Sequence, residues 1–221
     1  MGQIRSNFKG TDRQWARVEG AVRHVFKICN TRYRYIETDS TVRVAEFAAQ
    51  AAEACLKANS ITPQEVDLLI YGGIAREYFE PATAMEVAAN LGIQKVHAFD
   101  VTSACVGLLE AVHIAAAYIN MHQNINNVLV CSAELTRGYI DYNIQSPREV
   151  KYKAAGLTIG NAAAAWLIRR EPFGGGGLRL LAMDNYSLPE YWHLCYVPID
   201  GSFMSYSSEL FELAVHVVPE L

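Results

Sequence analysis

The sequence predicts an α/β layered fold, with a mostly parallel sheet flanked by helices. Short apolar runs of strand length, rich in β-branched and aromatic residues, occupy residues 66–73, 96–104 and 127–134. Apolar side chains recur at helical spacing in 82–92 and 107–119, between those runs. Helix-start signals precede several of the helical stretches, as described below. Strands that alternate with helices are typical of a parallel sheet covered by helices.

Length and charge exclude several classes of protein. The chain has 221 residues, a formal net charge of −4 and about half hydrophobic residues, enough for one or two domains with a core. The mild acidity argues against a nucleic-acid partner, and no apolar run reaches the ~20 residues of a membrane span. Five irregularly spaced cysteines without a CxxC pair favour a reducing cytoplasm and no metal site, namely Cys29, Cys55, Cys105, Cys131 and Cys195.

The first part of the chain contains two predicted helices. Residues 11–28 show roughly helical spacing, and 32–40 form a polar connection. Ser40 or Thr41 is predicted to cap a second helix with an apolar face from Val44 to Cys55. Thr62, Pro63 and Glu65 form the pattern of a capping box, so a short helical turn should lead into the strand at 66–73.

The next part alternates helices with strands. Pro81 is predicted to open a helix that ends near Gly92, and a strand should then run to Cys105, followed by a long Ala-rich helix. Residues 127–134 and 160–170 read as further strands. Residues 177–186 are one more apolar run, joined to the preceding one by EPFGGGG. We interpret that segment as a hairpin connection and not as a phosphate loop, because no Lys-Ser/Thr follows it.

Cys105 lies at the seam between an extended run and a helical run. A thiol near a helix N-terminus meets free N–H groups and the positive end of the dipole, which favour the thiolate. Ligands of open α/β sheets also bind at the carboxyl ends of strands. The alternative is that Cys105 is a small buried cysteine without chemistry.

The segments TPQEVDLLIYGG, EPATAMEVAANLGI, HAFDVTSACVGLLEAVHIAAAYI, NNVLVCSAE, GLTIGNAAAAWLIRR and SYSSELFELAVHVVPEL resemble, in order and spacing, the N-terminal half of the thiolase superfamily. They look most like its ketoacyl-acyl-carrier-protein synthase III branch. The resemblance begins near residue 32. It implies an N-terminal helical or connecting segment at 1–31 and half of a thiolase-like domain at 32–221, with the C-terminal half absent.

The resemblance implies an acyl-condensing enzyme with Cys105 as nucleophile. Cys105 attacks the thioester of acyl-CoA or acyl carrier protein, and Claisen condensation with a second thioester follows. Backbone N–H groups, including that of Cys105, would stabilise the oxyanion. CoA or phosphopantetheine thioesters are substrates in this scheme, and neither a metal nor a resident cofactor is implied.

Three further residues are candidate site residues. The string around Glu80 is similar to head-to-head condensing thiolases of olefin biosynthesis, which implies that Glu80 in an apolar pocket deprotonates the second acyl chain. The alternative for Glu80 is a carboxylate favoured at a helix start. Phe79 is assigned to a pocket wall or dimer contact. Arg32 is a candidate for substrate phosphates, or else part of a solvated edge. Trp15 and Arg23 are assigned to packing and solvated charge.

The resemblance is incomplete. The family uses a Cys–His–Asn set whose His and Asn motifs lie in its C-terminal half, and neither motif occurs here. None of the six histidines matches the motif by its surroundings. The chain therefore looks like a fragment or one half of a split enzyme. The family's Gly-Asp-Gly-Ala segment reads Gly-Asn-Ala-Ala at 160–163.

Three functions remain open. The first is β-ketoacyl synthase III-type condensation, decarboxylative or head-to-head. The second is a non-catalytic partner subunit that completes another subunit's site, for example with Glu80. The third is acyl transfer to an alcohol or amine without a new C–C bond. A homodimer is expected, with 127–134 as the interface strand, and a separate C-terminal half is a further possible partner.

Overall fold

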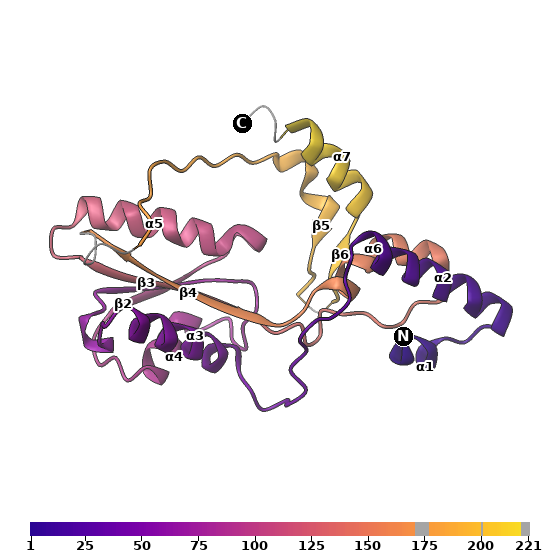
Figure 1. The fold of residues 1–221 in the computed structure, drawn as a ribbon, viewed down its shortest axis with the longest axis horizontal. Helices are drawn as coiled ribbons and strands as arrows, with labels where there is room; N and C mark the ends of the chain where they lie inside the picture. Colours follow the sequence, from indigo (N-terminus) through magenta and orange to yellow (C-terminus); the bar gives the residue numbers. More distant parts are fainter. Residues whose placement is uncertain (171–176, 200, 218–221) are drawn as a thin grey trace. The chain divides into compact units, whose positions relative to one another are not determined.

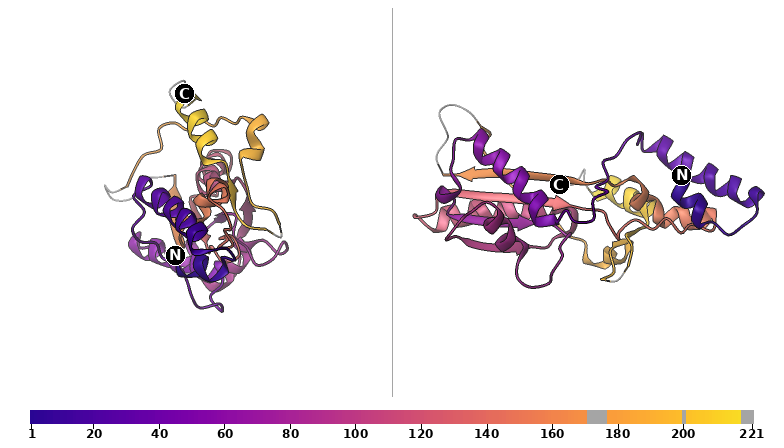
Figure 2. Two further views of the ribbon diagram at one scale, coloured as in Figure 1. Left: turned by 90° about the vertical axis from the view of Figure 1, so that its right-hand side faces the viewer. Right: turned by 90° about the horizontal axis from the view of Figure 1, so that it is seen from below.

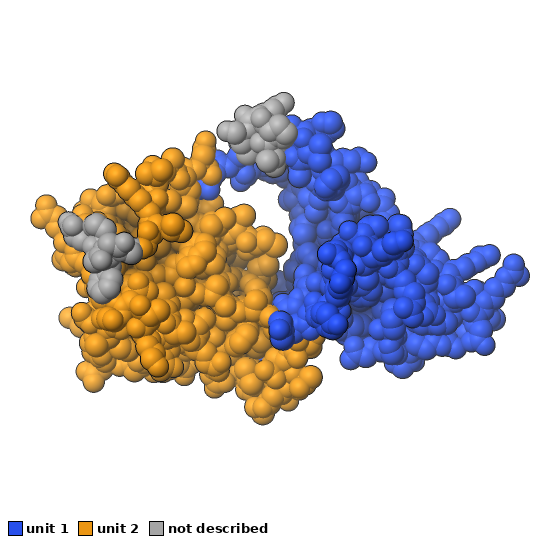
Figure 3. All heavy atoms as spheres, viewed as in Figure 1, with its two compact units in different colours: residues 1–35, 136–160, 185–221 blue, residues 36–135, 161–184 orange. Residues whose placement is uncertain are grey.

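The computed structural model describes residues 1–170, 177–199 and 201–217. The chain divides into two compact units (Figure 3). Unit 1 contains residues 1–35, 136–160 and 185–221, and unit 2 contains residues 36–135 and 161–184. Unit 1 therefore joins the N-terminal helices to two later segments. The division of the chain at residue 31, with half of a larger domain after it, stays a prediction.

Unit 2 is built on a four-stranded sheet in the order β2-β1-β3-β4. The strands are β1 (Leu68–Gly72), β2 (His97–Val101), β3 (Asn127–Glu134) and β4 (Ala162–Arg169). β1 pairs in parallel with β2 and β3, whereas β4 runs antiparallel to β3. The predicted α/β fold with a mainly parallel sheet is confirmed.

The prediction that residues 127–134 form an interface strand at an edge is wrong. β3 lies inside the sheet, with β1 on one side and β4 on the other. Its strong apolar character has a different cause, because Val128, Leu129, Val130 and Cys131 are fully buried within the unit. A strand covered on both faces reads as a continuous apolar run, as an edge strand in an interface also would. The edge strands are β2 and β4.

Helices cover both faces of the sheet (Figures 1 and 2). They are α3 (Val44–Ala58) and α4 (Thr83–Asn90) on one face and α5 (Gly107–Met121) on the other. Because side chains alternate along a strand, Leu68 and Ile70 of β1 pack against α5, while Leu69 and Tyr71 face the opposite layer. This arrangement places the carboxyl ends of β1 and β2 beside the N-terminus of α5.

Carboxylates accept free N–H groups at several turn and helix starts in unit 2. The capping box around the 3-10 turn η1 (Pro63–Glu65) is confirmed, because Glu65 accepts from the N–H and hydroxyl of Thr62 at 2.8 and 2.7 Å. The predicted cap of α3 at Ser40 or Thr41 is wrong. Asp39 accepts the N–H and hydroxyl of Thr41 in a turn, and α3 starts only at Val44.

Pro81 lies two residues before α4 and does not occupy its first turn. Asp100 of β2 accepts hydrogen bonds from the N–H groups of Thr83 and Ala84, at 2.8 Å each. Those two N–H groups belong to the first turn of the helix, where no backbone carbonyl of the helix can accept them. A carboxylate from the sheet therefore fixes where α4 begins.

One stretch, Ala104–Met121, is long and apolar enough to cross a membrane by length and composition alone. The expectation of no membrane span overlooked this window, most of which is α5. Ala111, Val112, Ala115 and Ile119 of α5 pack on β1 and β3 in the core of unit 2. Packing on the sheet accounts for the apolar character of this side of the helix without a bilayer.

The apolar run at 177–186 does not form the predicted strand. Residues 178–188 carry no regular secondary structure, and Leu178 and Leu181 are exposed. Most of the predicted hairpin connection, residues 171–176, lies outside the described residues. The run lacks β-branched residues and most of its side chains are exposed, so its leucines alone do not produce a strand.

Unit 1 is mainly helical. It contains α1 (Gly2–Asn7), α2 (Asp12–Ile28), α6 (Pro147–Thr158), η3 (Pro189–Leu194), β5 (Cys195–Tyr196), β6 (Met204–Ser205) and α7 (Ser207–Val217). The predicted helix at 11–28 is confirmed as α2, and Val18 and Val22 of α2 are fully buried in its core. Trp15 contacts the ring of Phe8, and Arg23 pairs with Glu19 at 2.7 Å, so the packing and surface-charge roles assigned to them are confirmed.

Candidate functional site

Cys105 lies in a short turn between β2 and α5. β2 ends at Val101, the 3-10 turn η2 (Ala104–Val106) follows, and α5 begins at Gly107. The side chain of Cys105 is exposed. The first N–H groups of a helix have no intrahelical partners, so this turn presents a thiol beside free donors. The predicted position of Cys105 between strand and helix is confirmed, and the alternative of a buried cysteine is wrong.

The turn is held against the end of β1 by two glycines. A Cβ on Gly72 would lie 2.3 Å from the carbonyl oxygen and 2.6 Å from the carbonyl carbon of Gly107. Both neighbours are backbone atoms, so neither can rotate away. The absence of a side chain at Gly72 therefore lets the N-terminus of α5 contact the end of β1.

Ala104, directly before Cys105, adopts a left-handed backbone conformation with φ of 45°. For a residue with a Cβ this conformation costs about 1–2 kcal/mol, and such strain gathers at functional turns. Ala104 is exposed, so packing of its own side chain does not offset that free energy. Other contacts of the turn must offset it.

Substitutions at Ala104 test this strain. Ala104→Gly should leave the free energy of unfolding within about 1 kcal/mol of wild type, because relief of strain offsets the more flexible unfolded chain. Ala104→Val should destabilise the protein by about 1–2 kcal/mol, because a β-branched side chain is worse in this conformation. Urea unfolding followed by circular dichroism measures both. Equal stability of the two variants would contradict a strained turn.

The other thiols of unit 2 are poor nucleophiles. Cys131 in β3 is fully buried, and desolvation raises its pKa to about 12. Burial likewise raises the pKa of the partly buried Cys55. A thiol that holds its proton this tightly is not a thiolate at neutral pH. Among the described residues of unit 2, only Cys105 has an exposed thiol.

Residues 73–76 after β1, here named the β1 loop, are held by two charged side chains. The carboxylate of Glu134, at the end of β3, accepts from the N–H groups of Ile74 and Ala75 at 2.8 and 3.2 Å. The guanidinium of Arg76 donates to the hydroxyl of Thr102 at 2.7 Å. Sequence patterns did not point to either residue, because Glu134 is 60 positions from Ile74 and Arg76 is 26 from Thr102.

The segment after the β1 loop is held to α3. Glu77 accepts from the N–H of Val44 at 2.8 Å, and the guanidinium of Arg43 lies over the ring of Tyr78, 5.2 Å from its centroid. Phe79 and Glu80 follow and are exposed, with 82% of the Phe79 surface accessible. The anchored loop thus ends by presenting an aromatic ring and a carboxylate to the surface. The apolar pocket expected around Glu80 is not formed by the described residues of unit 2, and its catalytic role stays a prediction.

The pH dependence of stability follows from the pKa of Glu134. Burial raises this pKa, although two backbone N–H donors and Arg76 oppose the shift. The folded state then keeps the proton to higher pH than the unfolded state does. The stability that Glu134 contributes is largest below its unfolded pKa of about 4.3 and is lost as pH rises through the folded pKa.

Comparison with Glu134→Gln isolates this effect, because glutamine does not titrate. The stability of wild type relative to Glu134→Gln should fall as pH rises from about 4 to 7. Urea midpoints of both proteins across this range measure the difference. A difference that is constant, or that rises with pH, would show that burial does not raise this pKa.

The candidate substrate-binding residue Arg32 lies in unit 1 and is exposed. Its neighbour Arg34 is used structurally, because its guanidinium donates to the carbonyls of Leu157 and Ile159. Of the two arginines, Arg32 is therefore the one with its charge on the surface. Cys105, Glu80 and Phe79 belong to unit 2. The role of Arg32 toward phosphates stays a prediction.

No histidine in the described part of unit 2 lies near Cys105. His113 is eight residues further along the chain, about 12 Å at the helical rise, and it is exposed. His97 begins β2, at the opposite end of the strand from Cys105, and its ring contacts those of Phe99 and Tyr118. His122 follows the last turn of α5 and packs on Tyr118. The expectation that these histidines do not serve as the catalytic base agrees with their positions.

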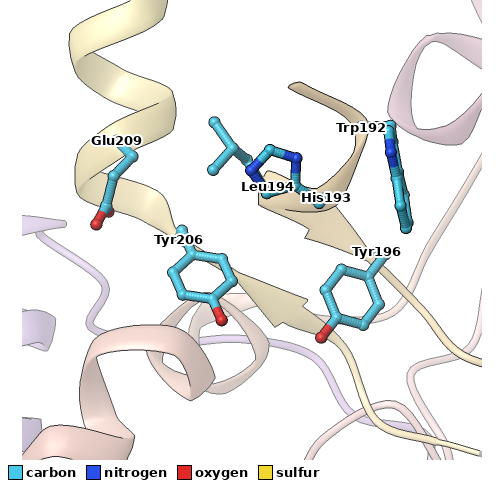
Figure 4. A pocket seen from close by; sticks show the side chains of 6 residues that line it. All are labelled: Trp192, His193, Leu194, Tyr196, Tyr206 and Glu209. Atoms are coloured by element: carbon cyan, nitrogen blue, oxygen red, sulfur yellow. The ribbon is translucent and has the colours of Figure 1, made fainter. Parts of the chain in front are cut away.

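Unit 1 contains a separate cavity of about 460 Å³ (Figure 4). Aromatic rings dominate its lining, which consists of Trp192, His193, Leu194, Tyr196, Tyr206 and Glu209. Its carboxylate is engaged outside the cavity lining, because Glu209 pairs with Lys151 at 2.6 Å. None of the sequence-predicted site residues lines this cavity, and its lining holds no nucleophile activated by a base.

Comparisons with known proteins agree with this geometry. The family model of the thiolase N-terminal domain matches residues 32–171. The β-ketoacyl-[acyl-carrier-protein] synthase III of Aquifex aeolicus is 27% identical over 204 residues, 88% of this chain and 62% of that enzyme. The Campylobacter jejuni enzyme of the same name is 31% identical over 103 residues, 46% of this chain and 32% of that enzyme. The chain thus spans 62% of the first of these relatives and 32% of the second.

Solved structures show the same fold. Xanthomonas campestris OleA, solved with bound lauric acid and lauroyl-CoA, superimposes with a TM-score of 0.78 at 22% identity, covering 92% of this chain and 65% of that one. The 3-oxoacyl-[acyl-carrier-protein] synthase III of Aquifex aeolicus gives a TM-score of 0.73 at 27% identity, over 85% and 56% of the two chains. With a family model matched over more than half of its length, this chain belongs to the thiolase superfamily through its N-terminal domain, and it is similar to the ketoacyl synthase III branch.

Proposed function

We propose that the chain is the nucleophile-bearing part of a thiolase-like acyl-condensing enzyme of the β-ketoacyl synthase III type. The observation that carries this proposal is the exposed Cys105 at the N-terminus of α5, beside the carboxyl ends of parallel strands, in a chain of the thiolase superfamily. Thiolates at helix N-termini are stabilised by the dipole and the free N–H groups.

In the proposed first step, the Cys105 thiolate attacks the carbonyl carbon of an acyl-CoA or acyl-carrier-protein thioester. Backbone N–H groups at the start of η2 and α5 stabilise the resulting oxyanion. The C–S bond to CoA or phosphopantetheine breaks, its thiolate leaves and takes up a proton, and the acyl group stays on the Cys105 sulfur. One thioester bond breaks and another forms, so the step requires little driving force and no further reactant.

In the proposed second step, a second acyl thioester supplies a carbanion that attacks the S-acyl group and releases the Cys105 thiolate. The carbanion arises by decarboxylation of a malonyl group or by proton removal from an acyl chain, for which Glu80 is the candidate base. The histidine and asparagine of the family's Cys–His–Asn set have no counterpart among the described residues of unit 2. We propose that a C-terminal half, on the same or a separate polypeptide, supplies them.

The proposed partners follow from this chemistry. They are acyl-CoA, acyl carrier protein and a second copy of the chain in a homodimer, and a cytoplasmic location suits all three. Neither nucleic acid nor a membrane is required. The edge strands available for a continuous dimer sheet are β2 and β4. An unpaired edge that joins a second copy is also protected from nonspecific aggregation.

A second candidate function is a non-catalytic partner subunit. Phe79 and Glu80 are exposed at the end of an anchored segment, as residues that complete a neighbouring subunit's site would be. In this case Cys105 accepts no acyl group. Acyl transfer to an alcohol or amine is the third candidate, and it shares the first step with condensation.

Product analysis separates the three functions. The protein is mixed with acyl-CoAs of increasing chain length, and then with malonyl-CoA, a second acyl-CoA, or a small alcohol and amine. A β-keto product supports condensation, whereas an ester or amide supports the third candidate. An S-acyl protein that discharges only after a C-terminal half of a relative is added supports the split-enzyme form. No acylation of the folded protein, either alone or with that C-terminal half, would exclude both enzymatic functions.

A further inference from the structure

We infer that Glu134 and Arg76 are positioning residues that hold the β1 loop against the cysteine turn and thereby fix Cys105 for acyl transfer. The cysteine turn is defined here as residues 102–106. The inference rests on the proposed function, since it requires Cys105 to accept an acyl group. Neither residue contacts Cys105 directly among the described interactions, so both act through the backbone between them.

The carboxylate of Glu134 binds two backbone N–H groups of the β1 loop. Its two carboxylate oxygens each accept one backbone donor, Ile74 at 2.8 Å and Ala75 at 3.2 Å. Behind this contact the fully buried hydroxyl of Tyr71 lies 2.8 Å from the carbonyl of Ala75 and 2.7 Å from that of Ala133. A partly buried carboxylate with two matched donors fixes a loop more tightly than a neutral acceptor, because charge-assisted hydrogen bonds are about twice as strong.

The guanidinium of Arg76 binds carbonyl groups of the same loop. Its Nη2 lies 3.3 Å from the carbonyl of Gly73, and its Nε lies 3.4 Å from that of Ile74. The same Nη2 donates to the hydroxyl of Thr102 at 2.7 Å. Thr102 stands three residues before Cys105. One planar guanidinium therefore joins the loop after β1 to the turn that carries the nucleophile.

The backbone contact between β1 and α5 completes the arrangement. Gly72 directly precedes the loop, and its Cα approaches the carbonyl of Gly107 so closely that no Cβ fits. The cysteine turn is thus held at Thr102 before Cys105 and at Gly107 after it. Acyl transfer depends on the Sγ and the oxyanion donors lying within a fraction of an ångström of their productive positions, and a 1 Å error costs about 100-fold.

Four variants and two matched controls test the inference. Glu134→Ala and Arg76→Ala remove the two contacts, and Glu134→Gln and Arg76→Lys restore them in part. Glu53→Gln and Arg179→Lys make the same conservative changes at exposed sites of unit 2. Two rates are measured at Cys105 by peptide mass mapping, acylation by an acyl-CoA and alkylation by iodoacetamide. Labelling of the buried Cys131 reports unfolding in the same samples.

We expect Glu134→Ala and Arg76→Ala to slow acylation about 10- to 100-fold. Alkylation, which needs an accessible thiol but no oxyanion donors, should stay within about threefold, because Cys105 is exposed already. Glu134→Gln and Arg76→Lys should give intermediate acylation rates, since each keeps one of the hydrogen bonds. Both controls should match wild type. Hydrogen exchange of the Ile74 and Ala75 amides should rise at least about tenfold in Glu134→Ala.

The inference is overturned if wild type is acylated and the two alanine variants acylate within about twofold of it, or if their loss is matched by labelling of Cys131. In the latter case the residues support only the fold. If wild type is not acylated at all, the proposed function fails by itself. Hydrogen exchange then decides the positioning claim, because unchanged protection of residues 74–75 and of the cysteine turn in Glu134→Ala overturns it.

Discussion

Replacing Cys105 with alanine should abolish acylation of the protein by acyl-CoA, a loss of at least about 10³-fold. The two other exposed thiols of the described residues, Cys29 and Cys195, do not lie at a helix N-terminus whose N–H groups could stabilise the oxyanion. The removed atom is exposed, so the fold should be unaffected. Transfer to the sulfur is the first covalent step of every enzymatic function proposed above. The variant therefore separates those functions from the partner-subunit function.

Cys131→Ala is the matched control for Cys105→Ala. Its thiol is fully buried and its pKa is raised to about 12 by desolvation, so it should not react in the folded protein. We expect acylation to be retained, with the free energy of unfolding lowered by about 1 kcal/mol for the lost packing. Equal acylation of wild type and Cys105→Ala would contradict the assignment of the nucleophile and direct attention to the exposed Cys29 and Cys195 of unit 1.

Gly72→Ala should be the most destabilising small substitution in unit 2. The new Cβ would meet the carbonyl oxygen of Gly107 at 2.3 Å, and relief of that overlap requires α5 to move away from β1. We expect a loss of about 3 kcal/mol in the free energy of unfolding, since overpacking against backbone is not absorbed by side-chain rotation. Acylation should fall with it, because Cys105 moves with the helix.

Two glycines serve as controls for Gly72→Ala. Gly107→Ala brings a Cβ only within 3.2 Å of Gly72, so we expect a smaller loss. Gly20 lies in α2, and a Cβ added there would meet no heavy atom within 4 Å, so Gly20→Ala should stabilise the helix by about 0.5–1 kcal/mol. Thermal and urea unfolding of the three variants give the ranking. Gly72→Ala as stable as wild type would contradict the close contact of β1 and α5.

Local signals made the elements with self-contained causes predictable. The capping box at Thr62 and Glu65 uses residues three positions apart, and the buried strand at 127–134 has the predicted bounds as β3. The seam at Cys105 was visible because a β-branched run changes to helical spacing there. Each of these patterns depends on residues close together in the chain, so the sequence contains the whole cause.

Features that depend on distant residues were not predictable in this way. At the start of α3, Glu77 accepts the N–H of Val44 from 33 positions away, in addition to the local Glu46, which accepts the N–H of Arg43. Ser40 and Thr41 were better caps by residue type alone. The interior position of β3 depends on its pairing with β4, not on its own composition. The run at 177–186 is apolar but contains no β-branched residue, and its described residues form no strand. In the site, Glu134 and Arg76 likewise anchor the β1 loop through contacts between residues far apart in the chain.

The most direct test of the central claim is to locate the acyl group on the wild-type protein. The protein is mixed with an acyl-CoA, digested under conditions that preserve thioesters, and its peptides are weighed. The account predicts one acyl-sized mass increase on the peptide that contains Cys105 and none on the peptides of the other four cysteines. An acyl group on Cys29 or Cys195, or no acyl group on a folded protein, would contradict Cys105 as the acyl-accepting nucleophile.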